Sequence, residues 1–422
     1  MNHSENVDQD AVLRARTMLL GSGGLSVEQE IDAYRVLAEV SPLTYMPKLS
    51  KALVSFGYAQ EFRDRPDIQL ALHAEAAAVA RRIDAGEPRR TELLLHALTA
   101  YQHRLYSAGR RTDGFAICVE MAEAGRQGFE RGQVQSPVYG HGRLAAVLAE
   151  EGRHREAAEI CGRFVQAARS DGSADVSFWT TVEWAAELDA AGLHDAALDA
   201  FAEMVDAGRS KLDAGSTSLA NLTWELVRHS QMLDAAGRRA GAGAARKEAL
   251  GLLAELGETG ERRSWSDILS WWTMLLGLSG RAQEPEASPR APAPPFGSTL
   301  WSHDTRQAYF DSLPALEEET ARLTEAARTD PHRHLPGLIA AHRRLTIRSA
   351  LHRENRGHGI LKPLRPVFDE GVALARRLDD LAGEDSRAVL ARALTDRSMF
   401  LLAAKQYGEA HDDFLVVTTL LD

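Results

Sequence analysis

Residues 184–201 read WAAELDAAGLHDAALDAF, and the fold of the whole chain follows from the pattern in this stretch. A bulky, a small and a large apolar residue precede Gly192, and a small and an aromatic residue follow it. The apolar positions on both sides of the glycine recur with the spacing of amphipathic helices. Glycine adopts a left-handed backbone at little cost, so it commonly ends a helix. The stretch therefore predicts two antiparallel helices joined by a turn at Gly192.

The same turn recurs along the chain. Successive turn glycines stand 43, 40, 45 and 43 residues apart, and a leucine lies four residues before each of them. Five residues after each of the first four glycines stands Gly or Ala, where two helices can approach closely. A single helical hairpin cannot cover its own apolar face, so such hairpins must stack. The turn glycines are Gly109, Gly152, Gly192, Gly237 and Gly280.

These columns resemble the tetratricopeptide repeat, in which bulky, small, large, Gly, small and aromatic residues follow one another in this order. The resemblance covers residues 90–280 and, with Lys405 in place of the glycine, residues 385–420. It implies an all-α fold of antiparallel helix-hairpin repeats stacked into an α-solenoid. The family repeat has about 34 residues, so the helices or loops of this chain must be longer. The residues that match most closely are Trp184, Ala185, Leu188, Gly192, Ala197 and Phe201.

Composition limits the class of protein. The chain has 422 residues, of which 44% are hydrophobic and 26% are charged, as in globular proteins. Its formal net charge of −11 disfavours general binding to nucleic acid, whose phosphates are also negative. The N-terminus has neither a basic segment nor an apolar run, and the most apolar window, residues 268–278, is only half a membrane span. We therefore expect a cytoplasmic protein without a membrane segment.

Breaks in the pattern predict the domain organisation. Residues 1–25 contain a short helix and a Gly/Ser-rich break, and residues 26–282 form the predicted repeat array. Residues 283–299 are rich in proline, which rules out helix and predicts an extended linker. Residues 300–422 form a helical C-terminal block that ends in a degenerate repeat.

The sequence contains no motif for catalysis or for a cofactor. Its 15 histidines do not have the spacing of a zinc site, so no metal is expected. Cys118 and Cys161 occupy the repeat column that also holds Phe201, which indicates buried structural cysteines and not a redox pair. We therefore expect a protein that is not an enzyme.

Residues 264–280 predict a helix that is apolar on several faces, with Trp271 and Trp272 at its centre. A helix that is apolar all round is buried. We expect the C-terminal block to cover it. The alternative is a contact between copies of the chain in a homo-oligomer.

The first function hypothesis is a non-catalytic scaffold or regulatory protein for a protein or peptide partner. The resemblance implies that the first helix of each repeat lines a concave groove. Six residues face this groove in the family's arrangement, and together they offer aromatic bodies and polar tips, as binding hot spots do. The alternative is that the aromatic residues pack between neighbouring repeats. The predicted groove residues are His96, His103, Tyr139, Trp179, Trp224 and Gln231.

The second hypothesis places an anionic ligand on the C-terminal block, either nucleic acid or a phosphorylated or acidic regulator. Residues 331–366 contain eight Lys and Arg residues against Glu354 alone. The alternative is internal pairing with acidic helices, such as residues 317–319 or Asp379 and Asp380. We prefer the groove, because stacked hairpins form a concave surface whatever their sequence. The candidate anion-binding residues are Arg343, Arg344, Arg348, Arg353 and Arg356.

Overall fold

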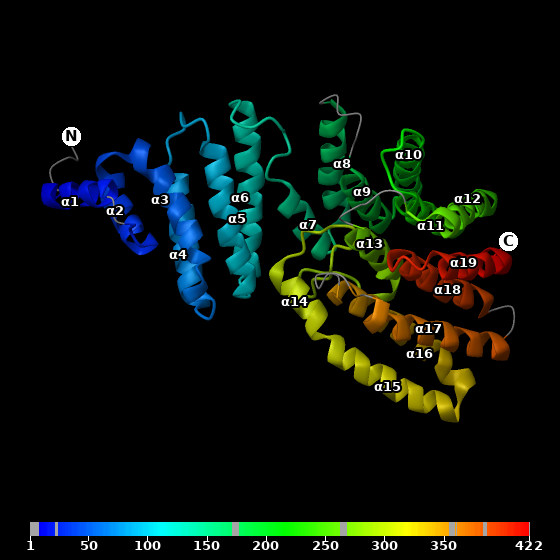
Figure 1. The fold of residues 1–422 in the computed structure, drawn as a ribbon. Helices are drawn as coiled ribbons and strands as arrows, with labels where there is room; N and C mark the ends of the chain where they lie inside the picture. Colours follow the sequence, from blue (N-terminus) through cyan, green and yellow to red (C-terminus); the bar gives the residue numbers. More distant parts are fainter. Residues whose placement is uncertain are drawn as a thin grey trace. The chain divides into compact units, whose positions relative to one another are not determined.

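The structure is a computed structural model in which the described part of the chain is helical apart from loops and turns (Figure 1). One isolated bridge joins Ser288 and Ala291, and the described ranges contain no strand. The all-α prediction is therefore confirmed. The structure describes residues 8–21, 24–170, 177–261, 268–353, 359, 361–382 and 386–421.

The chain divides into two compact units. The first holds residues 1–147 with 302–304, and the second holds residues 148–301 with 305–422. In the first unit each helix packs against the next one in the chain, from α1 to α6. The helices are α1 (Gln9–Leu20), α2 (Val27–Val40), α3 (Pro42–Gly57), the short 3-10 helix η1 (Gln60–Phe62), α4 (Pro66–Arg81), α5 (Arg90–Ser107), α6 (Arg111–Glu130) and α7 (Gly142–Glu150), which crosses the division.

The second unit combines helices from before and after the proline-rich segment. The helices before it are α8 (His154–Ser170), α9 (Phe178–Ala190), α10 (His194–Asp213), α11 (Leu219–Ala235), α12 (Arg239–Thr259), α13 (Ile268–Gly280) and the 3-10 helix η2 (Arg281–Gln283). The helices after it are α14 (His303–Asp311), α15 (Leu313–Thr329), α16 (Pro331–Arg353), α17 (Leu361–Ala382), α18 (Arg387–Ala403) and α19 (Tyr407–Leu421).

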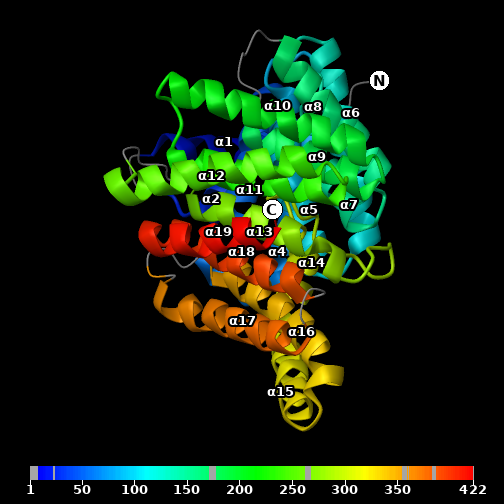
Figure 2. The same cartoon turned by 90° about the vertical axis from the view of Figure 1, so that its right-hand side faces the viewer.

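The spatial order of the helices in the second unit differs from their order in the chain. Helices α8 to α12 pack each against the next. Helix α12 then packs against α19, and the row continues through α18, α17 and α16 to α15, in reverse chain order (Figures 1 and 2). The apolar helix α13 packs against α11, α16 and α18. The C-terminal helices therefore share one hydrophobic core with the helices that precede them.

Four of the five turn glycines have the left-handed backbone that the sequence predicts. In each of these turns the residue after the glycine donates its N–H to the carbonyl of the repeat leucine, as Leu193 does to Leu188 at 2.9 Å. This Schellman motif satisfies carbonyl groups at the helix end. The prediction is wrong for Gly280, whose φ is −96°, because the chain continues into η2. The left-handed φ angles are 69° at Gly109, 76° at Gly152, 77° at Gly192 and 71° at Gly237.

Lys405 forms the same turn in the hairpin of α18 and α19. Its φ is 62°, and the next residue, Gln406, donates its N–H to the carbonyl of Leu401 at 2.8 Å. Lys405 is the only non-glycine residue with a positive φ among the described residues. The backbone geometry of the repeat turn is thus kept where the sequence lacks the glycine.

The small residues of the repeat are buried where two helices of a hairpin meet. The Cα of Gly114 lies so close to Tyr106 that an added Cβ would be 2.8 Å from its ring. Cys118 and Cys161 are buried, as the column predicts. The other small residues that stand five positions after a turn, like Gly114, are Ala157, Ala197, Ala242 and Ala410, all with 0% exposure.

The composition of the proline-rich segment, residues 283–299, predicts an extended linker, and in the structure this segment packs against neighbouring residues. Phe296 is buried, with its ring against Trp301 and Tyr309. Ala293 donates its N–H to the carbonyl of Glu150 at 3.0 Å, which fixes the segment to the end of α7. The two compact units therefore divide within α7 and not at this segment. Proline does exclude helix here, but it does not prevent the chain from packing.

The apolar helix α13 is covered by the C-terminal helices. Trp271 and Trp272 are buried, and the Trp272 ring lies 6.1 Å from the Phe368 ring and 5.8 Å from the Phe400 ring. The expectation that the C-terminal block covers this helix is confirmed.

Candidate ligand-binding site

The predicted groove is filled where it passes through the second unit. Trp224 is buried, and its indole Nε1 donates to the carbonyl of Met399 in α18 at 3.3 Å. Trp179 packs against the Trp271 ring at 5.2 Å. Trp224 is therefore engaged inside the core, whereas Trp179 is only half-buried and its place in a partner site stays a prediction. Gln231 is half-buried and accepts an N–H from Arg228 at 3.3 Å.

The other three predicted groove residues belong to the first unit. His96 is exposed on α5. His103, on the same helix, lies 5.4 Å from the His303 ring, and burial and the neighbouring Arg104 lower its pKa to about 4. Tyr139 is exposed, but it lies in the turn before α7 and not on the helix. A partner site at His96 and Tyr139 stays a prediction.

The predicted basic patch is mostly internal. Arg348 donates twice to the Glu284 carboxylate, at 2.8 and 2.7 Å, and its guanidinium lies 4.1 Å from the centre of the Tyr309 ring. Arg344 lies 4.0 Å from the carboxylate of Glu284 and 3.9 Å from that of Glu319. Internal pairing therefore occurs, but mainly with partners other than those expected. The side chain of Arg353 and all of Arg356 lie outside the described residues.

Arg343, the remaining patch residue, spans the space between α16 and α18. Its guanidinium donates to the Asp396 carboxylate at 2.6 and 3.2 Å and to the Ser279 hydroxyl at 2.7 Å. Arg343 and Asp396 are both buried. The anion-site prediction is wrong for Arg343 and Arg348, because carboxylates of the chain itself pair with both guanidinium groups.

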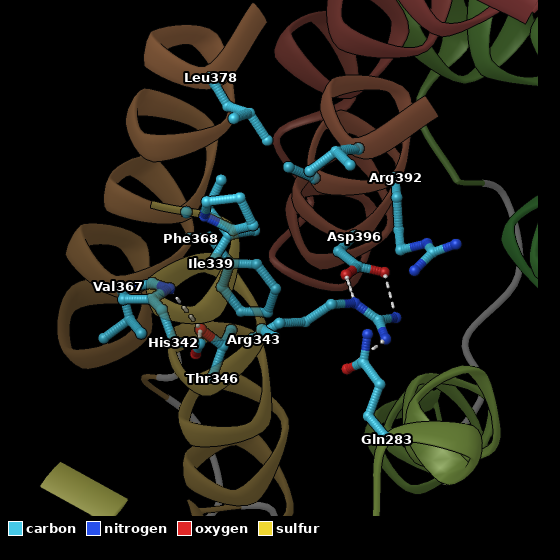
Figure 3. Close-up of a pocket in the computed structure, with 15 residues that line it drawn as sticks. Gln283, Ile339, His342, Arg343, Thr346, Val367, Phe368, Leu378, Arg392 and Asp396 are labelled. Atoms are coloured by element: carbon cyan, nitrogen blue, oxygen red, sulfur yellow. Dashed lines mark hydrogen bonds and ion pairs between the residues drawn. The ribbon is translucent and has the colours of Figure 1, made fainter. Parts of the chain in front are cut away.

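A cavity of about 160 Å³ lies beside the Arg343–Asp396 pair, between α16, α17 and α18. Figure 3 shows its two sides: Phe368 and Ile339 lie on one, and Asp396 and Arg392 lie on the other. The cavity is mainly apolar, and its polar groups gather at the end formed by Arg343. Its apolar lining consists of Pro336, Ile339, Ala340, Val367, Phe368, Gly371, Leu378, Val389 and Ala393.

His342 and Thr346 add polar atoms to the α16 side of the cavity. The His342 ring Nε2 lies 3.5 Å from the Glu370 carboxylate, and burial lowers its pKa. The Thr346 hydroxyl donates to the carbonyl of His342 at 2.9 Å, one turn back on the same helix. This hydroxyl is therefore engaged with the backbone and is not poised as a nucleophile beside a base.

A smaller hollow of about 30 Å³ is also lined by Asp396. It is lined by Arg228 and Gln231 of α11 and by Ser279 at the end of α13. Asp396 lines both spaces; Arg343 and Arg392 line the cavity, and Arg228 lines the hollow.

Sequence reasoning did not find Arg228, Arg392 or Asp396. Arg392 and Asp396 stand four residues apart and share one face of α18, which was a visible signal. Arg228 comes from α11, far away in the sequence, and no local pattern connects it with α18. Only the packing of α18 against α11 brings the three residues together.

Comparison of the chain with known protein-family models and with curated proteins gave no match. In the described ranges no group of three or more His, Cys, Asp and Glu side chains has the arrangement of a metal site. None of the described helices combines the length and the apolar composition that crossing a membrane requires.

Proposed function

We propose that this chain is a non-catalytic, tetratricopeptide-like binding protein whose second unit takes a benzene-sized apolar group into the cavity between α16, α17 and α18. The observation that carries the proposal is the cavity itself, with apolar walls and polar groups at one end. Concave apolar sites with a few convergent polar groups are the usual form of small-molecule sites. An apolar cavity of about 150 Å³ can hold benzene, and this one has about 160 Å³.

The repeat class rests on the recurring turn. The same pair of backbone bonds closes α5 and α6, α9 and α10, α11 and α12, and α18 and α19. Ion pairs also recur between second helices of successive hairpins, as between Arg81 of α4 and Glu120 of α6, and between Arg209 of α10 and Glu248 of α12. Stacked helical repeats are stabilised by such contacts between neighbouring repeats.

A binding role fits the polar end of the cavity better than a catalytic one. Asp396 already accepts two N–H groups from Arg343, and Thr346 is bound to the backbone. These groups are held by fixed partners, so they can orient a ligand but have no free nucleophile and base side by side. The filling of the groove at Trp224 also favours a small ligand over an extended peptide in this unit.

Filling the cavity tests the proposal. Ala393→Leu places three more carbon atoms in the space that the ligand would occupy, whereas Ala388→Leu, on an exposed position of the same helix, does not. Binding of phenylacetate and of 2-phenylethanol should be measured by calorimetry and by saturation-transfer NMR. We expect Ala393→Leu to abolish binding and Ala388→Leu to leave it unchanged. Binding of neither compound to the wild-type protein would reject the proposal.

A further inference from the structure

We propose that the second unit holds a further ligand site, a cavity of about 280 Å³ that binds a small planar aromatic carboxylate. The cavity lies between α13, α14, the end of α16 and residues 296–301, and it shares no lining residue with the cavity described above. This site therefore stands apart from the proposed function. Arg306 of α14 binds the carboxylate, and the aromatic side chains beside it bind the ring.

Three aromatic rings line the cavity and hold one another in place. The Phe296 ring lies 5.8 Å from the Trp301 ring at 90°, and the Phe310 ring lies 6.3 Å from the Trp301 ring at 16°. The Trp301 indole Nε1 donates to the carbonyl of Ser298 at 2.8 Å, which fixes the orientation of this ring. The aromatic part of the lining is therefore formed before a ligand binds, as is usual for small-molecule sites.

Arg306 is the one charged residue in the described lining of the cavity. Its guanidinium carbon lies 5.9 Å from the centre of the Trp301 ring and 5.3 Å from that of the Phe310 ring, so two residues of the lining hold the cation. The side chain is half-buried, and within the described ranges it makes neither a hydrogen bond nor an ion pair. Its planar set of N–H donors matches the two oxygens of a carboxylate.

Two buried arginines of the same unit have carboxylate partners from the chain itself. Asp396 lies 2.6 Å from Arg343, and Glu284 lies 2.7 Å from Arg348. The partners of Arg306 are aromatic rings instead, and these stabilise a cation only in part. Taking a charge out of water without an opposite charge is costly, so a bound anion would stabilise the half-buried guanidinium group.

Volume and charge define the class of ligand. An apolar cavity of about 150 Å³ can hold benzene, so a cavity of about 280 Å³ accepts a fused two-ring group with a short acidic arm. One guanidinium group matches the single charge of a carboxylate, whereas a phosphate ester brings close to two negative charges. 1-Naphthylacetate satisfies both requirements, and its neutral analogue 2-(1-naphthyl)ethanol satisfies only the first.

Calorimetric titration of the full chain with these two compounds tests the role of Arg306. Arg306→Gln should weaken 1-naphthylacetate binding about tenfold or more, the usual effect of losing a charge-assisted hydrogen bond. The same variant should bind 2-(1-naphthyl)ethanol as the wild type does, which also shows that its cavity is intact. Arg322→Gln, at an exposed position of α15, is the matched control and should change neither affinity.

Filling the cavity tests its location. Thr299 lines the cavity from an exposed position before α14, so Thr299→Phe should abolish binding of both naphthyl compounds. Thr329→Phe, at an exposed position of α15, is its control. Ala393→Leu, which fills the other cavity, should leave 1-naphthylacetate binding unchanged. Thermal melts show whether each variant is folded.

The outcomes separate this site from the proposed function. Binding of 1-naphthylacetate that is lost in Arg306→Gln and in Thr299→Phe, but kept in both controls and in Ala393→Leu, supports the site. Equal affinity for the two compounds, with no effect of Arg306→Gln, overturns the assignment of a carboxylate. Failure of the wild type to bind 1-naphthylacetate, or binding that survives Thr299→Phe, overturns the site and leaves the proposed function standing.

Discussion

Replacing Lys405 by glycine should stabilise the hairpin of α18 and α19. Lys405 is an L-residue with a φ of 62°, in a turn whose counterparts at Gly109, Gly192 and Gly237 are glycines. Its side chain is exposed, so the substitution changes the backbone energy and little else. Gly192→Ala makes the opposite change at the equivalent position of another turn. An added Cβ at Gly192 meets nothing within 4 Å, so this substitution also changes mainly the backbone energy.

The magnitude follows from two opposing terms. A left-handed backbone costs an L-residue about 1–2 kcal/mol. Glycine relieves that cost but adds about 0.4–1 kcal/mol of conformational entropy to the unfolded state. We therefore expect Lys405→Gly to raise the free energy of unfolding by about 0.5–1 kcal/mol and Gly192→Ala to lower it by about the same amount.

Hydrogen exchange measured by mass spectrometry is the suitable assay, because local opening of one hairpin is visible even when a chain of two units does not unfold in one step. Peptides that cover residues 398–414 should exchange about 2- to 5-fold more slowly in Lys405→Gly than in wild type. Lys405→Ala, which keeps a β-carbon, is the control and should exchange at the wild-type rate. Faster exchange in Lys405→Gly, or equal slowing in Lys405→Ala, would refute the reasoning.

Three further predictions concern residues within helices. Gly371→Ala should raise the free energy of unfolding in urea by about 0.5–1 kcal/mol, because the added Cβ would make only ordinary contacts within α17. Gly128→Ala should lower the free energy of unfolding by roughly 1–3 kcal/mol, because the added Cβ would lie 2.3 Å from Thr91 Oγ1. Burial raises the pKa of Glu225 to about 8. The stabilising contribution of its protonated form is therefore fully present below about pH 4.5 and is lost as the pH rises through 8. Glu225→Gln should remove this part of the pH dependence of the melting temperature. Cys161 should react with thiol reagents only as fast as the second unit opens, because it is buried and burial raises its pKa; labelling at the rate of a free thiol would contradict the burial.

Local signals in the sequence were sufficient for the helices and their turns. A left-handed turn four residues after a buried leucine is a property of a few consecutive residues, and the spacing at Leu188 and Gly192 displays it directly. The same pattern even predicted the hairpin at Lys405, where the glycine is missing. Gly280 was misread because η2 extends the helix beyond it, and no local residue marks that extension.

The path of the chain after α13 was not predictable in this way. Proline content at residues 283–299 reports on backbone hydrogen bonds, but it does not report on the burial of Phe296, which depends on Trp301 and Tyr309. The charge of Arg343 suggested a ligand, yet its partner Asp396 lies on another helix. Both errors have one physical cause: the partners come from distant segments, and only the packed structure brings them together.

The reversed row of helices has a consequence for synthesis on the ribosome. Helix α12 ends at Thr259, and the helix that covers its free side, α19, begins at Tyr407. At about 5–20 residues per second, roughly 7–30 s pass between the synthesis of the end of α12 and that of the start of α19. Helix α13, with Trp271 and Trp272, ends at Gly280, and its later neighbours α16 and α18 begin only 51 and 107 residues further along the chain. The nascent chain therefore exposes its most apolar helix for seconds, which makes that helix the natural target for a general chaperone while the second half of the protein is being translated.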